Sequence, residues 1–143
     1  MPPFELPAAD TPFGARVAAH LRDDIVVWLI TTGADGTPQP NPVWFLWDGT
    51  NFLIYSLPDA ARLAHIKAVP RVALNFAGNG AGGDIVIFTG SAHIASEEPP
   101  AHQNAAYIAK YRERMARSFG DPATFAARYS TPVRVEPTKL RGH

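Results

Sequence analysis

Three prolines at alternate positions, Pro38, Pro40 and Pro42, constrain the fold of this chain more than any other feature of its sequence. In an extended strand, alternate residues direct their backbone groups to the same side, so the three missing N–H groups all fall on one edge. That edge cannot pair with a neighbouring strand. The residues that follow, Val43 to Trp47, can pair normally, so the segment is predicted to be a strand with one unpairable side.

Hydrophobic patterns and turn residues divide the rest of the chain into strands and helices. Strands are predicted at 25–32, 43–47, 51–56, 71–76, 84–96 and 131–136, and helices at 12–22, 60–68, 101–119 and 122–129. The first strand is apolar at odd and even positions alike, which is typical of a strand buried on both faces. Asp59 is predicted to cap the short helix that follows it.

The predicted fold class is mainly β with peripheral helices. Six strands joined mostly as hairpins must curl or close into a small barrel to bury their faces and protect their edges. The 143 residues, of which 46% are hydrophobic, can fill one hydrophobic core. Residues 12–143 are therefore predicted to form a single domain, preceded by an extended, proline-rich lead-in at residues 1–11.

Composition excludes several classes of protein. Thirteen basic and thirteen acidic side chains give a formal net charge of zero, which argues against a nucleic-acid partner. The absence of cysteine excludes a disulfide scaffold, a thiolate nucleophile and an iron–sulfur cluster. The longest apolar run, Ile25 to Ile30, is far shorter than the roughly 20 residues of a membrane span. The N-terminus has no secretory signal pattern, so a cytoplasmic location is expected.

No motif identifies a catalytic side chain or a metal site. Residues 78–83 match the dinucleotide-binding string G-x-G-x-x-G, but a strand follows where that motif needs a helix, so a hairpin loop is predicted instead. The five histidines have no metal-ligand spacing, and no serine lies in a G-x-S-x-G elbow. If the protein is an enzyme, a bound cofactor is expected to carry the chemistry.

One region has the composition of a phosphate site. Ser56 ends a predicted strand, and the helix after it carries Arg62 and Lys67. A hydroxyl and two cations beside a helix N-terminus suit a phosphate group. An ordinary amphipathic helix with solvated basic residues would have the same spacing, and the residues alone leave both interpretations open.

The order of the segments resembles the pyridoxamine-phosphate-oxidase-like split β-barrel family, and within it the actinobacterial branch that binds the deazaflavin coenzyme F420. The resemblance covers about residues 12–141. It is carried by short segments in a fixed order, which are Thr31–Thr32, Ala34–Pro40, Pro42–Gly49, Ile54–Ser56, Ala61–Leu63, Pro70–Val72, Gly82–Asp84, Thr89–Ala92 and Tyr107–Tyr111.

The resemblance implies a homodimer of six-stranded split barrels with two cofactor sites at the interface. It places the flavin or deazaflavin ring against the backbone of the second strand and the phosphate at a hydroxyl and a basic helix residue. The residues concerned are Asn41, Pro42, Val43 and Trp44 for the ring, Ser56, Arg62 and Lys67 for the phosphate, and Gly82 and Gly83 from the partner subunit at the ring's border. The family often has lysine at the position of Arg62 and a basic residue at that of Ala60.

The activity implied is hydride transfer from reduced F420 to a small unsaturated or carbonyl-containing substrate such as a quinone. Two alternatives stay open at this point. The same fold could hold FMN as a flavin reductase or oxidase, or it could serve as a non-enzymatic carrier of a flavin or tetrapyrrole. In none of these does a side chain of the protein act as the redox centre.

Overall fold

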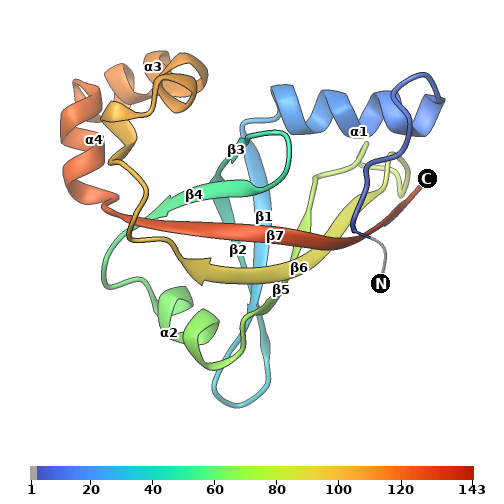
Figure 1. The fold of residues 1–143 in the computed structure, drawn as a ribbon, viewed down its shortest axis with the longest axis horizontal. Helices are drawn as coiled ribbons and strands as arrows, with labels where there is room; N and C mark the ends of the chain where they lie inside the picture. Colours follow the sequence, from blue (N-terminus) through green and yellow to red (C-terminus); the bar gives the residue numbers. More distant parts are fainter. Residues whose placement is uncertain (1–2) are drawn as a thin grey trace.

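A computed structural model describes residues 3–143, and Figure 1 shows their arrangement. The elements in chain order are α1 Pro12–Asp23, β1 Val26–Thr32, β2 Pro38–Trp44, β3 Leu46–Trp47, β4 Phe52–Ser56, α2 Ala61–Ala68, β5 Arg71–Asn75, β6 Val86–Ile94, the 3-10 turn η1 Ala101–Gln103, α3 Ala105–Phe119, α4 Pro122–Arg128 and β7 Thr131–Gly142. The strands form one antiparallel sheet in the order β2-β1-β5-β6-β7-β4-β3. This sheet curls into a half-barrel, as predicted, but with seven strands in place of six.

The extra strand arises because the predicted run Val43 to Trp47 is interrupted at Phe45. β2 ends at Trp44, and the chain enters β3 two residues later, at Leu46. β3 pairs with β4 and is the last strand at the opposite end of the sheet from β2. β2 lies at the other end, which confirms that its proline side has no neighbour among the described strands. Its inner side pairs with β1 along its whole length, from Val26 opposite Trp44 to Thr32 opposite Pro38.

Two hydrophobic cores share the strand β4, which is buried at all five positions. Phe52 and Ile54 point into the core enclosed by the curled sheet and α1. Leu53 and Tyr55 point the other way, into a second core under α3 and α4. The two late helices cover this outer face beside β4 in Figure 1.

The prediction that the first strand is buried on both faces is wrong. β1 alternates, with Val27 and Leu29 fully buried but Val26 and Trp28 exposed by 38% and 39%. The outward face of this strand is therefore apolar and partly exposed at Val26 and Trp28. The periodicity was ambiguous because every residue from Ile25 to Ile30 is hydrophobic, whichever face it occupies.

Predicted boundaries also differ from the structure at several places. Asp59 does not cap α2, whose N-cap is Ala60 and has no side-chain hydrogen bond. The predicted helix 101–119 is broken at Asn104, whose Oδ1 accepts from the Tyr107 N–H at 3.0 Å and so starts α3. The final strand runs six residues beyond its predicted end at Glu136. In the lead-in, Phe4 packs edge-on against Phe88 of the core.

No helix within residues 3–143 is long and apolar enough to cross a membrane. The glycine-rich residues 78–83 connect β5 and β6 as a hairpin loop, as predicted. Asn79 holds the loop closed, since its Oδ1 accepts from the N–H groups of Ala81 at 2.8 Å and Gly83 at 3.0 Å.

Candidate functional site

The position of β2 is fixed from outside the sheet by two side chains of α3. The Tyr111 hydroxyl accepts a hydrogen bond from the Phe45 N–H at 2.8 Å and lies 2.7 Å from the Ile25 carbonyl oxygen, to which it can donate. The Lys110 ammonium donates to the Phe45 carbonyl at 2.9 Å. These bonds satisfy the backbone groups that Phe45 would otherwise give to a neighbouring strand. The residues just before it therefore face a cavity in a defined orientation.

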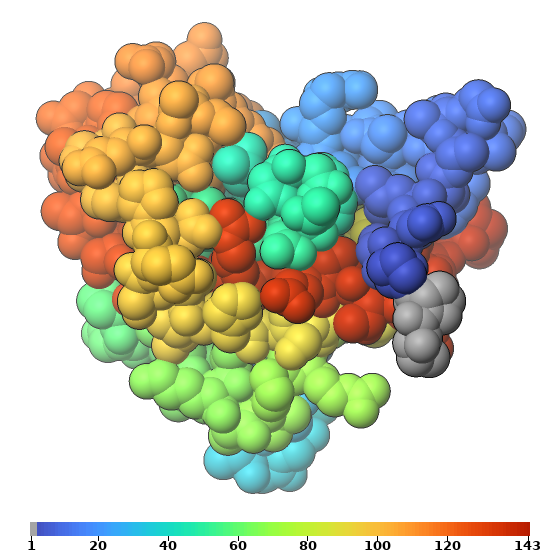
Figure 2. Space-filling view, in the orientation of Figure 1, coloured from blue at the N-terminus to red at the C-terminus, as the bar shows by residue number. Residues whose placement is uncertain are grey.

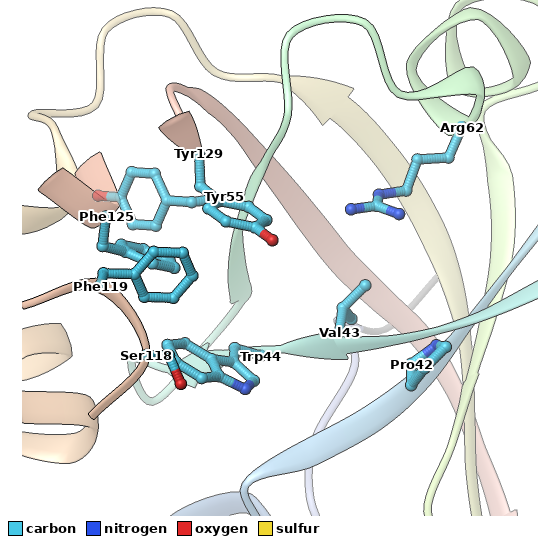
Figure 3. A pocket seen from close by; sticks show the side chains of 9 residues that line it. All are labelled: Pro42, Val43, Trp44, Tyr55, Arg62, Ser118, Phe119, Phe125 and Tyr129. Carbon is cyan, nitrogen blue, oxygen red and sulfur yellow. The ribbon is translucent and has the colours of Figure 1, made fainter. Parts of the chain in front are cut away.

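This cavity has a volume of about 250 Å³ and lies where β2, β4, α2 and the two late helices meet. It is lined by Pro42, Val43, Trp44, Tyr55, Arg62, Ser118, Phe119, Phe125 and Tyr129. Figure 3 shows Arg62 on one side, with its guanidinium pointing toward the aromatic side chains on the other. We call it the Arg62 cavity. Its walls combine one cation with flat apolar surfaces.

The cation of the cavity is held by the buried hydroxyl that ends β4. Arg62 Nε donates to Ser56 Oγ at 3.1 Å, and Ser56 is fully buried. Within residues 3–143 no carboxylate pairs with this guanidinium. Burial lowers the pKa of Arg62, and only Tyr129 opposes that effect. A half-buried guanidinium without a carboxylate gains free energy when an anion binds to it.

The opposite wall is a stack of aromatic rings. Trp44 stacks on Phe125 with a centroid distance of 5.2 Å, and Phe125 stacks on Tyr129 at 4.8 Å. Phe119 meets both Trp44 and Phe125 edge-on. On its other side Trp44 lies parallel to Tyr111 at 4.6 Å. Both faces of Trp44 and of Phe125 are covered by neighbouring rings, so this wall offers a dry apolar surface made largely of ring edges.

The outer edge of β2 supplies a third kind of group. In an antiparallel strand each residue directs its N–H and its carbonyl to the same side. The prolines lack the N–H, so at Pro38, Pro40 and Pro42 this edge carries carbonyl acceptors only. A ligand with an N–H donor at its rim can use these oxygens.

Of the nine residues singled out in the sequence, the structure brings five together. Pro42, Val43, Trp44 and Arg62 line the cavity, and Ser56 lies behind it. The other four do not line the cavity. Asn41 is on β2, and Lys67 is exposed on the last turn of α2. Gly82 and Gly83 line a separate hollow of about 220 Å³ in the β5–β6 loop. The expectation for the two glycines concerned a partner subunit, so a single chain does not test it.

Sequence reasoning missed five of the residues that line the cavity, namely Tyr55, Ser118, Phe119, Phe125 and Tyr129. Phe119 fits the helical periodicity of α3, which gives no reason to place it at a cavity. Tyr55 lies in a strand whose residues are all buried, so its pattern gives no reason to prefer it. The available signal was the excess of aromatics between 107 and 129, but their spacing does not indicate which of them surround a cavity.

A curled antiparallel sheet open along one proline edge, with a cavity beside that edge, defines the class of split-barrel β proteins. The family model for pyridoxamine 5'-phosphate oxidase matches residues 13–141. The chain belongs to this family. That match agrees with the extent of the resemblance found in the sequence. No protein of established function matches the chain in a sequence search of curated proteins.

Solved structures with the same fold differ in what their names say they do. The chain is similar to an F420 reductase at 26% identity, with 86% of this chain and 94% of that one covered and a TM-score of 0.66. It is similar in fold to a conserved hypothetical protein from Mycobacterium tuberculosis, at 20% identity, coverage of 96% and 88%, and a TM-score of 0.70. It is also similar in fold to the heme storage protein HutZ from Vibrio cholerae, at 11% identity, coverage of 92% and 95%, and a TM-score of 0.65.

Proposed function

We propose that the protein is an F420-dependent reductase that acts as a homodimer on a small unsaturated or carbonyl-containing substrate, such as a quinone. The observation that carries the proposal is the Arg62 guanidinium, held by the buried Ser56 hydroxyl and without a carboxylate partner in the described chain. The 26% identity to an F420 reductase supports the choice of the deazaflavin over FMN.

The residues present fit a flat, anionic cofactor. Arg62 would bind its phosphate through the guanidinium N–H groups that Ser56 leaves free. The carbonyl oxygens along the proline edge of β2 would accept hydrogen bonds from an N–H group of its ring. The stack of Trp44, Phe125 and Tyr129 would exclude water from one side of the site. When bound, reduced F420 supplies the hydride, so no side chain has to act as the redox centre.

The homodimer is supported by the partly exposed apolar face of β1. Val26 and Trp28 are two of the three large hydrophobic residues that the described chain exposes. In the register of the sheet, they stand opposite Trp44 and Pro42 of β2. A second copy covering this face would bury apolar surface and extend the walls of the Arg62 cavity.

The carrier alternative has less support from the cavity itself. The residues that line it include no histidine, cysteine or methionine, which are the side chains that most often ligate heme iron. Tyr55 and Tyr129 are the lining residues of a type that ligates heme iron, and the likeness to a heme storage protein at 11% identity concerns the fold alone. FMN has a phosphate and a flat ring as well, so it stays the main competitor in the test.

The test is a parallel titration of F420 and FMN into the purified protein and three variants. F420 is expected to bind the wild type more tightly than FMN. Arg62→Ala is expected to weaken F420 binding by roughly 10- to 100-fold, the value of a hydrogen-bonded charge, and Arg62→Lys by less. Arg112→Ala, which removes an exposed cation of α3 outside the cavity, is the matched control and should bind like the wild type.

Activity is then measured by mixing the protein with reduced F420 and a panel of quinones. Oxidation of the coenzyme that depends on both protein and quinone is the expected result. Tighter binding of FMN would favour the flavin alternative, and tight binding of F420 without turnover would favour the carrier. If Arg62→Ala binds F420 as well as the wild type does, Arg62 is not the phosphate ligand.

A further inference from the structure

A second hollow lies between α1 and α3, with β3 as its floor. Figure 2 shows it as the notch between the orange helix α3 and the blue helix α1. Its volume is about 500 Å³, and its lining consists of Leu6, Ala18, Leu21, Arg22, Leu46, Trp47, Ala106, Ala109 and Lys110. It shares no residue with the Arg62 cavity. We call it the Lys110 groove.

The lining of the Lys110 groove is apolar, with positive but no negative side chains. Its lining residues are aliphatic or aromatic except for Arg22 and Lys110, and none of them is acidic. Arg22 is already paired with its neighbour Asp23, through Nε at 2.9 Å and Nη2 at 2.8 Å. Lys110 therefore provides the available positive charge of an otherwise apolar surface.

The Lys110 ammonium is only partly compensated. One of its three donors goes to the Phe45 carbonyl at 2.9 Å, and the nitrogen lies 3.6 Å from the centroid of the Phe45 ring. No carboxylate of residues 3–143 lies within ion-pair distance of it. Burial lowers the pKa of Lys110 to about 8, against the opposing charges of Asp24 and Asp23 farther off. An anion beside the ammonium would recover part of this desolvation cost.

We propose that the Lys110 groove binds a small carboxylate with an apolar body, the carboxylate at the Lys110 ammonium and the body along α1, β3 and α3. A charge-assisted hydrogen bond would use the free ammonium donors. The apolar body would cover the exposed alanines of α3, Ala106 and Ala109. An inorganic anion lacks that body, and a neutral apolar molecule leaves the ammonium unpaired, so neither matches the groove as well.

The proposal is tested with octanoate and 2-naphthoate as probes, one aliphatic and one aromatic. Binding is followed by NMR from the methyl shifts of Ala106 and Ala109, which line the groove. Octanol, 2-naphthol and octylammonium are the matched probes without the negative charge. At least one carboxylate is expected to bind roughly 10-fold or more tightly than its uncharged analogue. Equal affinity of the carboxylates and the probes without a negative charge would overturn the proposal. So would the absence of any shift of the Ala106 and Ala109 methyl signals.

Variants locate the charge that matters. Lys110→Met is expected to remove the preference for the carboxylate, whereas Lys110→Arg should retain most of it. Lys139→Met, at an exposed lysine of β7, is the control and should behave like the wild type. If Lys110→Met fails to fold because the Phe45 carbonyl loses its donor, the probe series on the wild type still decides the question.

A second readout follows from linkage between binding and protonation. The chain has only three lysines, at 67, 110 and 139, so each can be followed by NMR in protein labelled with ¹³C in the lysine side chains, which leaves the ammonium groups unmodified. A bound carboxylate must raise the pKa of Lys110, and its affinity must fall as the pH rises through about 8. A carboxylate that binds without moving this titration binds somewhere else, which would also contradict the proposal.

Discussion

Tyr107 and Tyr111, one turn apart on α3, are both fully buried but differ in their hydrogen bonds. The Tyr111 hydroxyl forms hydrogen bonds with the backbone of Phe45, where the sheet is interrupted. The Tyr107 hydroxyl has no hydrogen-bond partner among the described residues, and burial strongly raises its pKa. A buried hydroxyl without a partner destabilises the fold, whereas one that replaces a missing strand neighbour stabilises it.

This contrast predicts opposite effects for the same substitution. Tyr107→Phe is expected to leave the free energy of unfolding unchanged or to raise it by up to about 1 kcal/mol, because it removes an unpaired polar group. Tyr111→Phe is expected to lower it by roughly 1–3 kcal/mol, because the Phe45 N–H is left without an acceptor. Urea unfolding of both variants measures the difference, and equal effects would contradict this account of the Phe45 interruption.

Among the elements, β7 is tied to the β3–β4 turn and to the segment before η1 by one arginine. Arg134 Nη1 lies 2.6 Å from Asp48 Oδ2, and its Nε lies 2.5 Å from Glu98 Oε1. Asp48 also accepts from the backbone N–H groups of Asn51 at 2.8 Å and Thr50 at 2.9 Å. Burial raises the pKa of Asp48, but these hydrogen bonds outweigh it and lower the pKa to about 2.

A carboxylate whose pKa is lower in the folded than in the unfolded chain stabilises the fold at any pH above its unfolded-state pKa. This stabilisation is lost as the pH falls through the folded-state pKa and the carboxylate becomes protonated. Between about pH 4 and pH 2, protonation of Asp48 is therefore expected to lower the free energy of unfolding by roughly 1 kcal/mol, less than the full shift implies because solvent screens this exposed carboxylate. Asp48→Asn should flatten the stability curve in that window, while Asp59→Asn, at an exposed position, should not. Unfolding in urea at several pH values between 2 and 7 measures this, and unchanged acid dependence in Asp48→Asn would rule Asp48 out as its source.

The element boundaries that the sequence did not predict depend on contacts distant in the chain. The run Val43 to Trp47 looks continuous, and its interruption is imposed by Tyr111, 66 residues away. The final strand continues past Pro137 because β6 and β7 change register between Thr89 and Gly90. Gly90 allows this close approach, since a Cβ there would lie 2.2 Å from the Glu136 carbonyl oxygen. Neither effect leaves a periodic signal in the sequence.

For the whole molecule, the exposed apolar face of β1 gives a direct test of the proposed homodimer. Trp28→Glu places a charge in the middle of that face and is expected to convert a dimer into a monomer. Val69→Glu is the matched control, because Val69 is exposed to a similar degree, 37% against 39%, but lies outside the strand. Analytical ultracentrifugation of the three proteins measures the outcome. A wild type that stays monomeric at high concentration would contradict the homodimer.

The class of fold could be predicted because it depends on local features of the chain, such as alternating prolines, hairpin turns and short apolar strands. The cavity could be predicted only on the side built from β2, Ser56 and Arg62. Its aromatic wall depends on how α3 and α4 pack over β4, which periodicity does not specify. The expected place of Gly82 and Gly83 depends on a second copy of the chain and stays a prediction.

The alternating prolines of β2 also bear on how the molecule behaves in concentrated solution. An uncovered strand edge is a template for further strands, and cross-β fibrils grow from such edges. β2 has an edge of this kind, but at Pro38, Pro40 and Pro42 it cannot donate the hydrogen bonds that an incoming strand would need. The protein can thus keep one side of its barrel open for a ligand without offering a seed for aggregation.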